Sequence, residues 1–171
     1  VEVFANKDQD LDASIYRFGD GSPLIELIID ENDKPKWYVE NTSGTGYSAD
    51  GSDGDTELNR WYHLAAVKSG TTLTFYLNGV SKATATGLSG DFGNATDTTD
   101  IGSRGSAEKA FGGYMDSLRV SNSARYTENN FTPPKESFTN DSNTKLLIQN
   151  GTDGSQTFTD GSSGSHTITV N

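Results

Sequence analysis

Short runs of apolar and β-branched residues recur along the chain, and each run ends at residues that favour turns. The clearest turn is Asn78-Gly79, because both residues tolerate the positive φ angles of a type I′ hairpin. We predict strands at residues 1–5, 14–18, 24–29, 36–40, 61–68, 71–77, 80–85, 100–102, 111–120, 145–149, 156–159 and 166–170. A loop rich in Gly, Ser and Asp is expected at 43–55, and a helical turn at 123–130. This series of short strands predicts an all-β fold, a two-sheet antiparallel β-sandwich.

Composition narrows the function classes. The chain has 171 residues and a formal net charge of −11, enough length for one large all-β domain with its own core. Such a negative chain is a poor partner for phosphate backbones and anionic lipids, so we expect no nucleic-acid role and no membrane-surface role. No apolar run approaches the roughly 18 to 20 residues of a membrane-spanning helix. The absence of cysteine removes thiol catalysis, thiolate metal sites and disulfides.

Two segments carry a family resemblance. Residues 61–67 form a Trp-x-His-x-Ala-x-Val strand, and residues 111–121 read Phe-Gly-Gly-Tyr-Met-Asp-Ser-Leu-Arg-Val-Ser. With Ala124-Arg125-Tyr126 and the Phe-Thr-Pro-Pro of residues 131–134, they resemble the laminin-G-like, concanavalin A-like lectin/glucanase superfamily, in versions found in phage virion proteins and bacterial surface proteins. The resemblance spans roughly residues 1–134 and implies a jelly-roll sandwich in which Trp61 packs in the core and His63 is structural. It also implies an extracellular, cell-surface or virion location.

The two ends of the chain raise a question of assembly. Residues 1–5 already read as a strand, with no Met or leader, so we expect a removed leader or a piece of a longer polypeptide. Residues 135–171 resemble the opening strands of the same fold, which normally come first. This segment either completes the sandwich of residues 1–134 or fills the same place in a neighbouring copy. The second arrangement would assemble copies head to tail through residues 145–170 into a filament.

Residues 26–31 contain the first candidates for catalytic carboxylates. The glucanases of the superfamily place two Glu and one Asp at alternate positions of one strand, which faces one cleft. Here Glu26 and Asp30 share a face, but Glu31 points to the other side, so the second glutamate is missing. We therefore expect no enzyme activity, and a glycoside hydrolase is our third and weakest alternative.

Calcium is the better chemical candidate. One loop carries carboxylates at alternate positions, and a second carries three within six residues beside glycines. Hard cations take six to eight oxygen ligands, which a flexible Asp/Gly loop can supply together. The candidate ligands are Asp8, Asp10 and Asp12 in the first loop and Asp50, Asp53 and Asp55 in the second. Each loop can equally be a solvated acidic turn.

Sugar binding requires exposed aromatic faces beside hydrogen-bonding groups. Tyr47 lies in a Gly/Ser/Thr segment and is our first candidate for a glycan platform. Trp37 is the second, although Trp37 and Tyr38 point to opposite faces of one strand, so that one of them is expected to be buried.

The leading interpretation is a non-enzymatic module of an extracellular or virion surface, which serves adhesion or carbohydrate binding and has a glycan or other cell-surface ligand as its partner. The alternative is a structural subunit of a filament or appendage, which assembles by donating its C-terminal strands. Calcium is the one cofactor that we expect.

Overall fold

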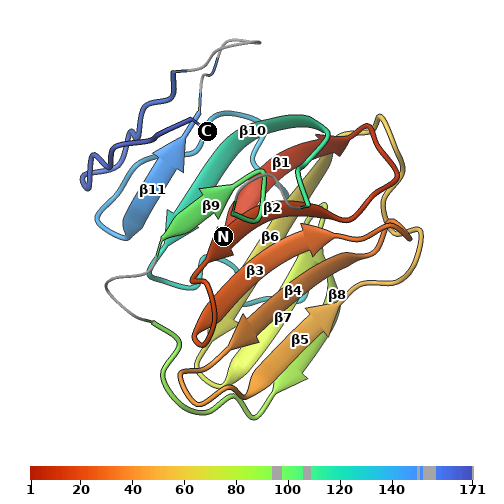
Figure 1. Cartoon of the computed structure of the whole chain (residues 1–171), viewed down its shortest axis with the longest axis vertical. Helices are drawn as coiled ribbons and strands as arrows, with labels where there is room; N and C mark the ends of the chain where they lie inside the picture. Colours follow the sequence, from red (N-terminus) through yellow and green to blue (C-terminus); the bar gives the residue numbers. More distant parts are fainter. Residues whose placement is uncertain (94–97, 106–108, 150, 152–156, 171) are drawn as a thin grey trace.

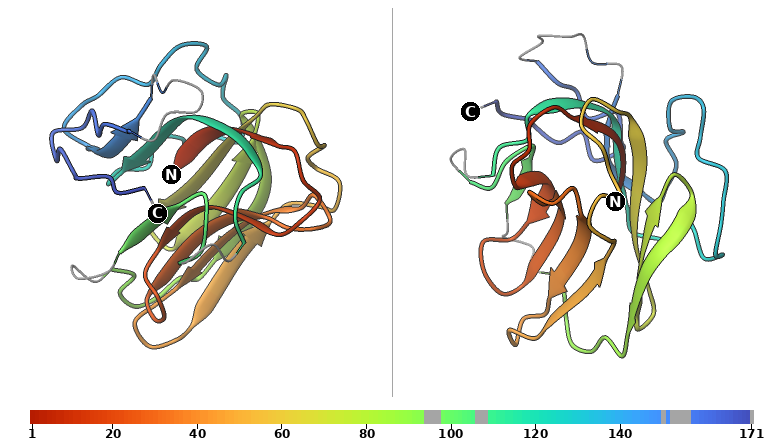
Figure 2. Two further views of the ribbon diagram at one scale, coloured as in Figure 1. Left: turned by 45° about the horizontal axis from the view of Figure 1, so that its top comes forward. Right: turned by 90° about the vertical axis from the view of Figure 1, so that its right-hand side faces the viewer.

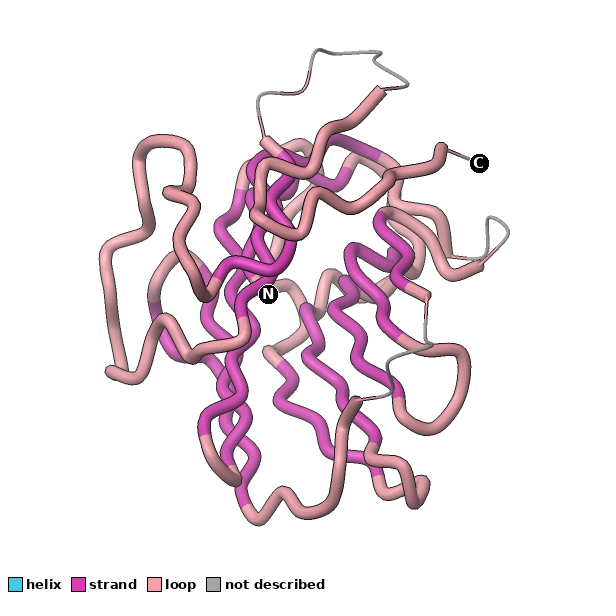
Figure 3. The backbone as a smooth tube through the Cα atoms, turned by 90° about the vertical axis from the view of Figure 1, so that its left-hand side faces the viewer, coloured by secondary structure: helices cyan, strands magenta, loops and turns pink. Residues whose placement is uncertain are grey.

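The computed structural model describes residues 1–93, 98–105, 109–149, 151 and 157–170. The described residues contain eleven strands and no helix, and the strands form two antiparallel sheets (Figures 1 and 3). The predicted all-β sandwich is therefore confirmed. The helical turn predicted at 123–130 is wrong, because that segment follows an irregular, bent path that ends in a bridge between Asn130 and Val80. Among the described residues, none belongs to a helix that could cross a membrane.

The larger sheet, sheet A, has the strand order β11-β10-β1-β6-β7-β8. Its strands are β1 (Glu2–Lys7), β6 (Tyr62–Ser69), β7 (Thr72–Leu77), β8 (Val80–Thr86), β10 (Gly113–Ser121) and β11 (Thr144–Ile148). The predicted hairpin joins β7 to β8, where Asn78 and Gly79 both have positive φ, of 50° and 80°. Gly79 is required, since a Cβ there would lie 2.0 Å from the Phe131 carbonyl oxygen.

The smaller sheet, sheet B, has the order β5-β4-β3-β2-β9. Its strands are β2 (Ala13–Phe18), β3 (Leu24–Ile29), β4 (Pro35–Glu40), β5 (Gly46–Asp50) and β9 (Thr99–Ile101). Strand β5 falls inside the segment predicted as a loop, so that prediction is wrong. The segment pairs along the whole of β4 while presenting few apolar side chains, because β5 is an edge strand that buries little besides Ala49.

The core lies between the two sheets, which face each other in the right-hand view of Figure 2. Alternate residues of each strand point inward, so that Val3 and Leu64 of sheet A meet Ile15 and Leu27 of sheet B. Phe75 is fully buried at the centre of β7. Burying a side chain of this size stabilises the fold by about 1.5–3 kcal/mol.

A further layer covers the outer face of sheet A. Residues 122–143 cross this face without forming a strand or helix, and they follow the cyan trace outside the sheet in the right-hand view of Figure 2. Tyr126 and Phe131 stack at a centroid distance of 3.6 Å, and the Phe131 ring packs 5.3 Å from that of Tyr76. The outer face of sheet A is therefore covered over β6 and β7, which explains why β6 is buried at consecutive positions.

The C-terminal segment lies beside β11 (Figure 1). Strand β11 pairs with β10 of the same chain, so the run predicted at 145–149 joins its own sheet. The strand predicted at 166–170 is wrong, as is that at 156–159 over its described residues 157–159, whereas residue 156 lies outside the described part. Instead the Asp160 carboxylate accepts hydrogen bonds from the Leu147 and Ser162 backbone N–H groups, at 3.0 and 2.8 Å. The Asp160 side chain thus supplies part of the pairing at this edge, beside one main-chain hydrogen bond from the Gly161 N–H to the Leu147 carbonyl at 2.8 Å.

Candidate functional site

The two tryptophans of the chain have opposite environments. Trp37 on β4 is 3% exposed and packs in the core, whereas Trp61 is 48% exposed. Trp61 immediately precedes β6 and alternates with Tyr62, whose ring points into the core. The sequence-based placement of Trp61 in the core is therefore wrong, and so is the prediction that Trp37 offers a free face to a sugar. Burial on both faces of β6 made the inward direction of that strand ambiguous in the sequence.

Trp61 lines an open groove of about 540 Å³ on the outer face of sheet A. The other lining residues are Phe4, Asp116, Ser117, Pro134, Lys135, Glu136 and Ser137. Phe4 points outward because its neighbours Val3 and Ala5 point into the core. Since Phe4 is paired with Asp116 of β10, the two side chains share the outer face. Residues 134–137 of the covering segment form the opposite side of the groove.

A β-bulge lies at the floor of this groove. Glu2 pairs with Arg119 and Phe4 pairs with Asp116, so two steps along β1 correspond to three along β10. The extra residue is accommodated where Ser117 adopts a φ of 53°, in the left-handed region that is unfavourable for a residue with a Cβ. The Ser117 hydroxyl donates a hydrogen bond to the Asp116 carboxylate at 3.2 Å. The bulge thus leaves Asp116 exposed beside the groove while Leu118, two residues later, enters the core.

The base of the groove is tightly packed. The Phe4 ring stacks on Phe138 at 6.1 Å and meets His63 edge-on at 4.9 Å. The Arg119 guanidinium lies 4.5 Å above Phe138, and its Nε donates to the Glu2 carboxylate at 2.7 Å. Because rings and an ion pair fix Phe4 from below, the groove is largely preformed, as small-molecule sites usually are.

This set of residues suits a sugar. The exposed indole of Trp61 offers an apolar face to the C–H groups of a pyranose ring. Asp116 and Glu136 offer carboxylate oxygens that accept hydrogen bonds from sugar hydroxyls, and the Lys135 ammonium donates them.

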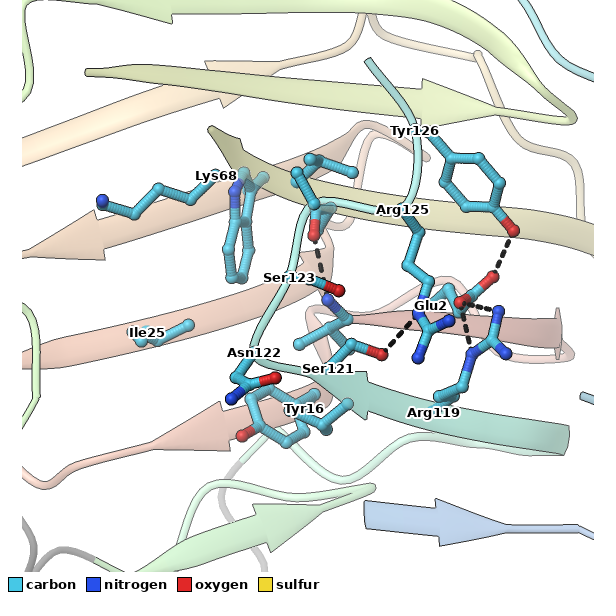
Figure 4. A pocket seen from close by; sticks show the side chains of 16 residues that line it. Glu2, Tyr16, Ile25, Lys68, Arg119, Ser121, Asn122, Ser123, Arg125 and Tyr126 are labelled. Carbon is cyan, nitrogen blue, oxygen red and sulfur yellow. Dashed lines mark hydrogen bonds and ion pairs between the residues drawn. The ribbon is translucent and has the colours of Figure 1, made fainter. Parts of the chain in front are cut away.

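A second cavity, of about 310 Å³, opens between the sheets where Tyr16, Ile25 and Trp37 of sheet B face sheet A (Figure 4). Its charged walls are occupied by contacts within the protein. Glu2 accepts a hydrogen bond from the Tyr126 hydroxyl at 2.6 Å as well as that from Arg119. The Arg125 guanidinium donates to Ser121 at 2.9 Å.

These contacts shift the titration of the buried groups. Burial acts to raise the pKa of Glu2, but the His63 ring 3.5 Å away, the hydrogen bond from Tyr126 and the charge of Arg119 outweigh burial and lower the pKa to about 2. Burial, followed by the hydrogen bond to Glu2, raises the pKa of Tyr126 well above its ordinary value. The hydrogen bond from Tyr126 to the ionised Glu2 carboxylate therefore holds the covering segment, residues 122–143, on sheet A.

The other predicted carbohydrate residue, Tyr47, lies on β5 of sheet B, whereas Trp61 lines the groove on sheet A. Its ring is half-buried 6.0 Å from Phe92, and its hydroxyl is 3.1 Å from that of Ser89. The structure thus does not bring Tyr47, Trp37 and Trp61 into one site. Alternation gave no signal for Trp61, because the inward set Tyr62-Leu64-Ala66 and the outward set His63-Ala65-Val67 of β6 are both buried.

Four of the six carboxylates predicted to bind calcium contact lysines or hydroxyls. Asp12 pairs with Lys109 at 2.8 Å, and Asp50 accepts a hydrogen bond from Ser48. The ion pairs of the second loop are Asp53–Lys34 at 2.8 Å and Asp55–Lys82 at 2.6 Å.

The other two predicted calcium ligands, Asp8 and Asp10, are exposed. In the part of the chain that the structure describes, no three His, Cys, Asp or Glu side chains are grouped as metal ligands. Calcium binding stays a prediction that requires these ion pairs to open.

The carboxylates considered for hydrolysis are also paired. Glu26 is buried and bonds to Arg104 at 2.5 Å, and Asp30 pairs with Lys36 at 2.7 Å. Neither residue lines the groove or the cavity described above.

Comparison with known proteins supplies the family context. The model of a family described as the Concanavalin A-like lectin/glucanases superfamily matches residues 2–129. A candidate carbohydrate binding protein from Bacteroides ovatus superposes with a TM-score of 0.67 at 22% identity, over 96% of this chain and 49% of that protein. The chain thus spans about half of that protein.

Two further solved structures share the fold. The CBM40 of the Ruminococcus gnavus IT-sialidase, bound to α2,3 sialyllactose, gives a TM-score of 0.56 at 18% identity, over 66% of this chain and 68% of that one. The SAP-like pentraxin of Limulus polyphemus gives 0.55 at 17% identity, over 73% and 64%. Identities this low show a common fold alone. No curated protein matched the chain in the search.

Proposed function

Because this chain belongs to the concanavalin A-like lectin/glucanases superfamily, we propose that it is a non-catalytic carbohydrate-binding module whose ligand lies against Trp61. The observation that carries the proposal is the exposed indole of Trp61 in a preformed groove beside Asp116 and Glu136. The carbohydrate-binding names of two similar structures support the same class of ligand. A module of this kind serves adhesion at an extracellular, cell or virion surface.

The carboxylates at residues 26 and 30 give no support to hydrolysis, which agrees with a non-catalytic module. A retaining or inverting glycosidase needs two carboxyl groups that flank one glycosidic bond, one of which can give up a proton. Glu26 is ion-paired beneath Arg104, so it is poorly placed to act as an acid toward a substrate.

A glycan screen with site variants tests the proposal. The intact chain is applied to an array of plant, bacterial and animal glycans, and the affinity of each hit is measured for Trp61→Ala and Tyr47→Ala. We expect Trp61→Ala to weaken binding at least about tenfold, since stacking and burial of an aromatic ring contribute more than about 1.4 kcal/mol. Tyr47→Ala should bind like the unaltered chain. Loss of binding in Tyr47→Ala alone would move the site to β5, and an array without hits would contradict the proposal.

The second candidate function is assembly through the C-terminal segment. Residues 166–170 alternate Thr, Ile, Thr and Val after the histidine, and Val170 is 47% exposed. This β-prone run has no strand partner within the described chain, so it could add to a sheet edge of a second copy. Light scattering on the intact chain and on a chain ending at residue 164 tests this: only the intact chain should form large species. A monomeric intact chain would contradict it.

A further inference from the structure

We propose that the Trp61 groove selects neutral sugars and rejects glycans that carry carboxylates. This inference rests on the proposed function, since it assumes that the groove holds a glycan, and it adds the class of sugar. Three charged side chains line the groove, the anions Asp116 and Glu136 and the cation Lys135. One negative charge therefore remains where an acidic sugar would have to bind.

The groove also lacks the group that best recognises a carboxylate. A guanidinium binds a carboxylate through two parallel hydrogen bonds, which makes arginine the usual partner of acidic ligands. Each of the five arginines of this chain is already ion-paired with a carboxylate of the protein. The pairs are Arg17–Asp20, Arg60–Glu57, Arg104–Glu26, Arg119–Glu2 and Arg125–Asp141. An acidic sugar would therefore compete with a carboxylate of the protein for any of these guanidinium groups.

The lysines do not change this conclusion. Lys7, Lys34, Lys36, Lys82 and Lys109 pair with aspartates elsewhere in the molecule. Lys68 and Lys145 donate to the backbone carbonyls of Gly70 and Ser142, and neither lines the groove. Lys135 lies in the groove, but it is adjacent to Glu136 in the chain and shares the groove with Asp116. The net charge of −11 adds a repulsive field that acts on any anionic ligand.

The same carboxylates favour neutral sugars. Asp116 and Glu136 are exposed acceptors on the rim of an aromatic platform, and a neutral pyranose presents several hydroxyl donors around its apolar faces. Hydrogen bonds to charged acceptors are stronger than those between neutral groups. The hydrogen bonds from sugar hydroxyls and the repulsion of sugar carboxylates therefore both favour neutral sugars.

The test uses an array of matched glycans in which each neutral member has an acidic counterpart, such as lactose with 3′-sialyllactose and methyl-esterified polygalacturonate with polygalacturonate. At low salt we expect the neutral member of a bound pair to bind at least about tenfold more tightly, because placing like charges together costs more than about 1.4 kcal/mol. High salt should reduce the ratio of the neutral to the acidic affinity, since it screens the repulsion between the groove and the acidic glycan.

Two charge variants separate the local effect from the overall charge. Glu136→Lys should reduce the neutral-to-acidic affinity ratio at least severalfold, because it strengthens the binding of acidic glycans. Glu31→Lys changes the net charge equally at an exposed turn between β3 and β4 and should leave the ratio nearly unchanged. Acidic glycans that bind as tightly as their neutral counterparts would overturn the inference and leave the proposed function standing. An array without any bound glycan would overturn the proposed function itself.

Discussion

Phe4 and Asp116 lie directly opposite each other on β1 and β10, with the bulged residue Ser117 next to them. Cross-strand pairing fixes both side chains on the outer face of sheet A, while the bulge leaves the Asp116 carboxylate exposed. Trp61 enters the same groove from the residue before β6. The candidate site is thus built on β1, β10 and the residue before β6, with residues 134–137 on the opposite side.

The two tryptophans should separate binding from stability. Trp37→Ala removes a buried indole and should lower the free energy of unfolding by about 3–5 kcal/mol. Trp61→Ala removes an exposed ring and should change that free energy by about 1 kcal/mol or less. Urea unfolding of both variants measures the difference, and a large destabilisation by Trp61→Ala would show that this ring is a core residue in solution.

The bulge should tolerate some residues and reject others. Ser117 has a φ of 53°, where a β-branched side chain is strongly disfavoured. Ser117→Val should therefore lower the free energy of unfolding by about 1–2 kcal/mol relative to Ser117→Gly. Thermal melting of the two variants checks this order. Equal melting temperatures would mean that residue 117 is not in the left-handed region.

Glu2 should contribute to stability at neutral pH and lose that contribution in acid. Its folded pKa is lowered to about 2 from an unfolded value of 4.5, so its stabilisation is complete above pH 4.5 and is lost as the pH falls toward 2. The full contribution is about 3 kcal/mol by linkage. Denaturant unfolding from pH 6 to 2 should therefore show a steeper loss in the unaltered chain than in Glu2→Gln. Parallel curves would contradict the account.

Glu2→Gln should also cost stability at neutral pH, because it leaves the buried Arg119 guanidinium without its carboxylate partner. A control on an exposed pair, Glu57→Gln beside Arg60, should change stability by about 0–1 kcal/mol.

Calcium should raise the melting temperature above that in EDTA if either acidic loop binds it, since a ligand of the folded state stabilises that state. Asp12→Asn would remove the shift for a site in the first loop, and Asp55→Asn for one in the second. Both aspartates pair with lysines, so the shift should grow when Lys109→Ala or Lys82→Ala frees the relevant carboxylate. An unchanged melting temperature in all variants would end the calcium hypothesis.

The sequence was sufficient for the fold because its strand patterns and hairpin turn are local signals. The family resemblance is confirmed by the family model over residues 2–129. The edge strand β5 was missed because it buries only Ala49 deeply, and the strand expected at 166–170 was wrong because Asp160 satisfies the neighbouring edge instead.

The site was harder to predict, since it depends on which face of β6 points inward. Residues 122–143 cover the outer face of sheet A, so both faces of β6 are apolar and periodicity could not orient Trp61. Lys135 and Glu136 join the groove from a segment about 20 residues after Asp116 in the chain, a proximity that only the folded structure shows.

The most direct test of the central claim follows the indole N–H signals of the two tryptophans by NMR while a bound neutral glycan is added. A chain with two tryptophans gives two such signals, which Trp61→Phe assigns. We predict that the Trp61 signal shifts in a saturable way and that the buried Trp37 signal stays in place. A bound glycan that leaves the Trp61 signal unmoved would contradict the assignment of the binding site to this groove.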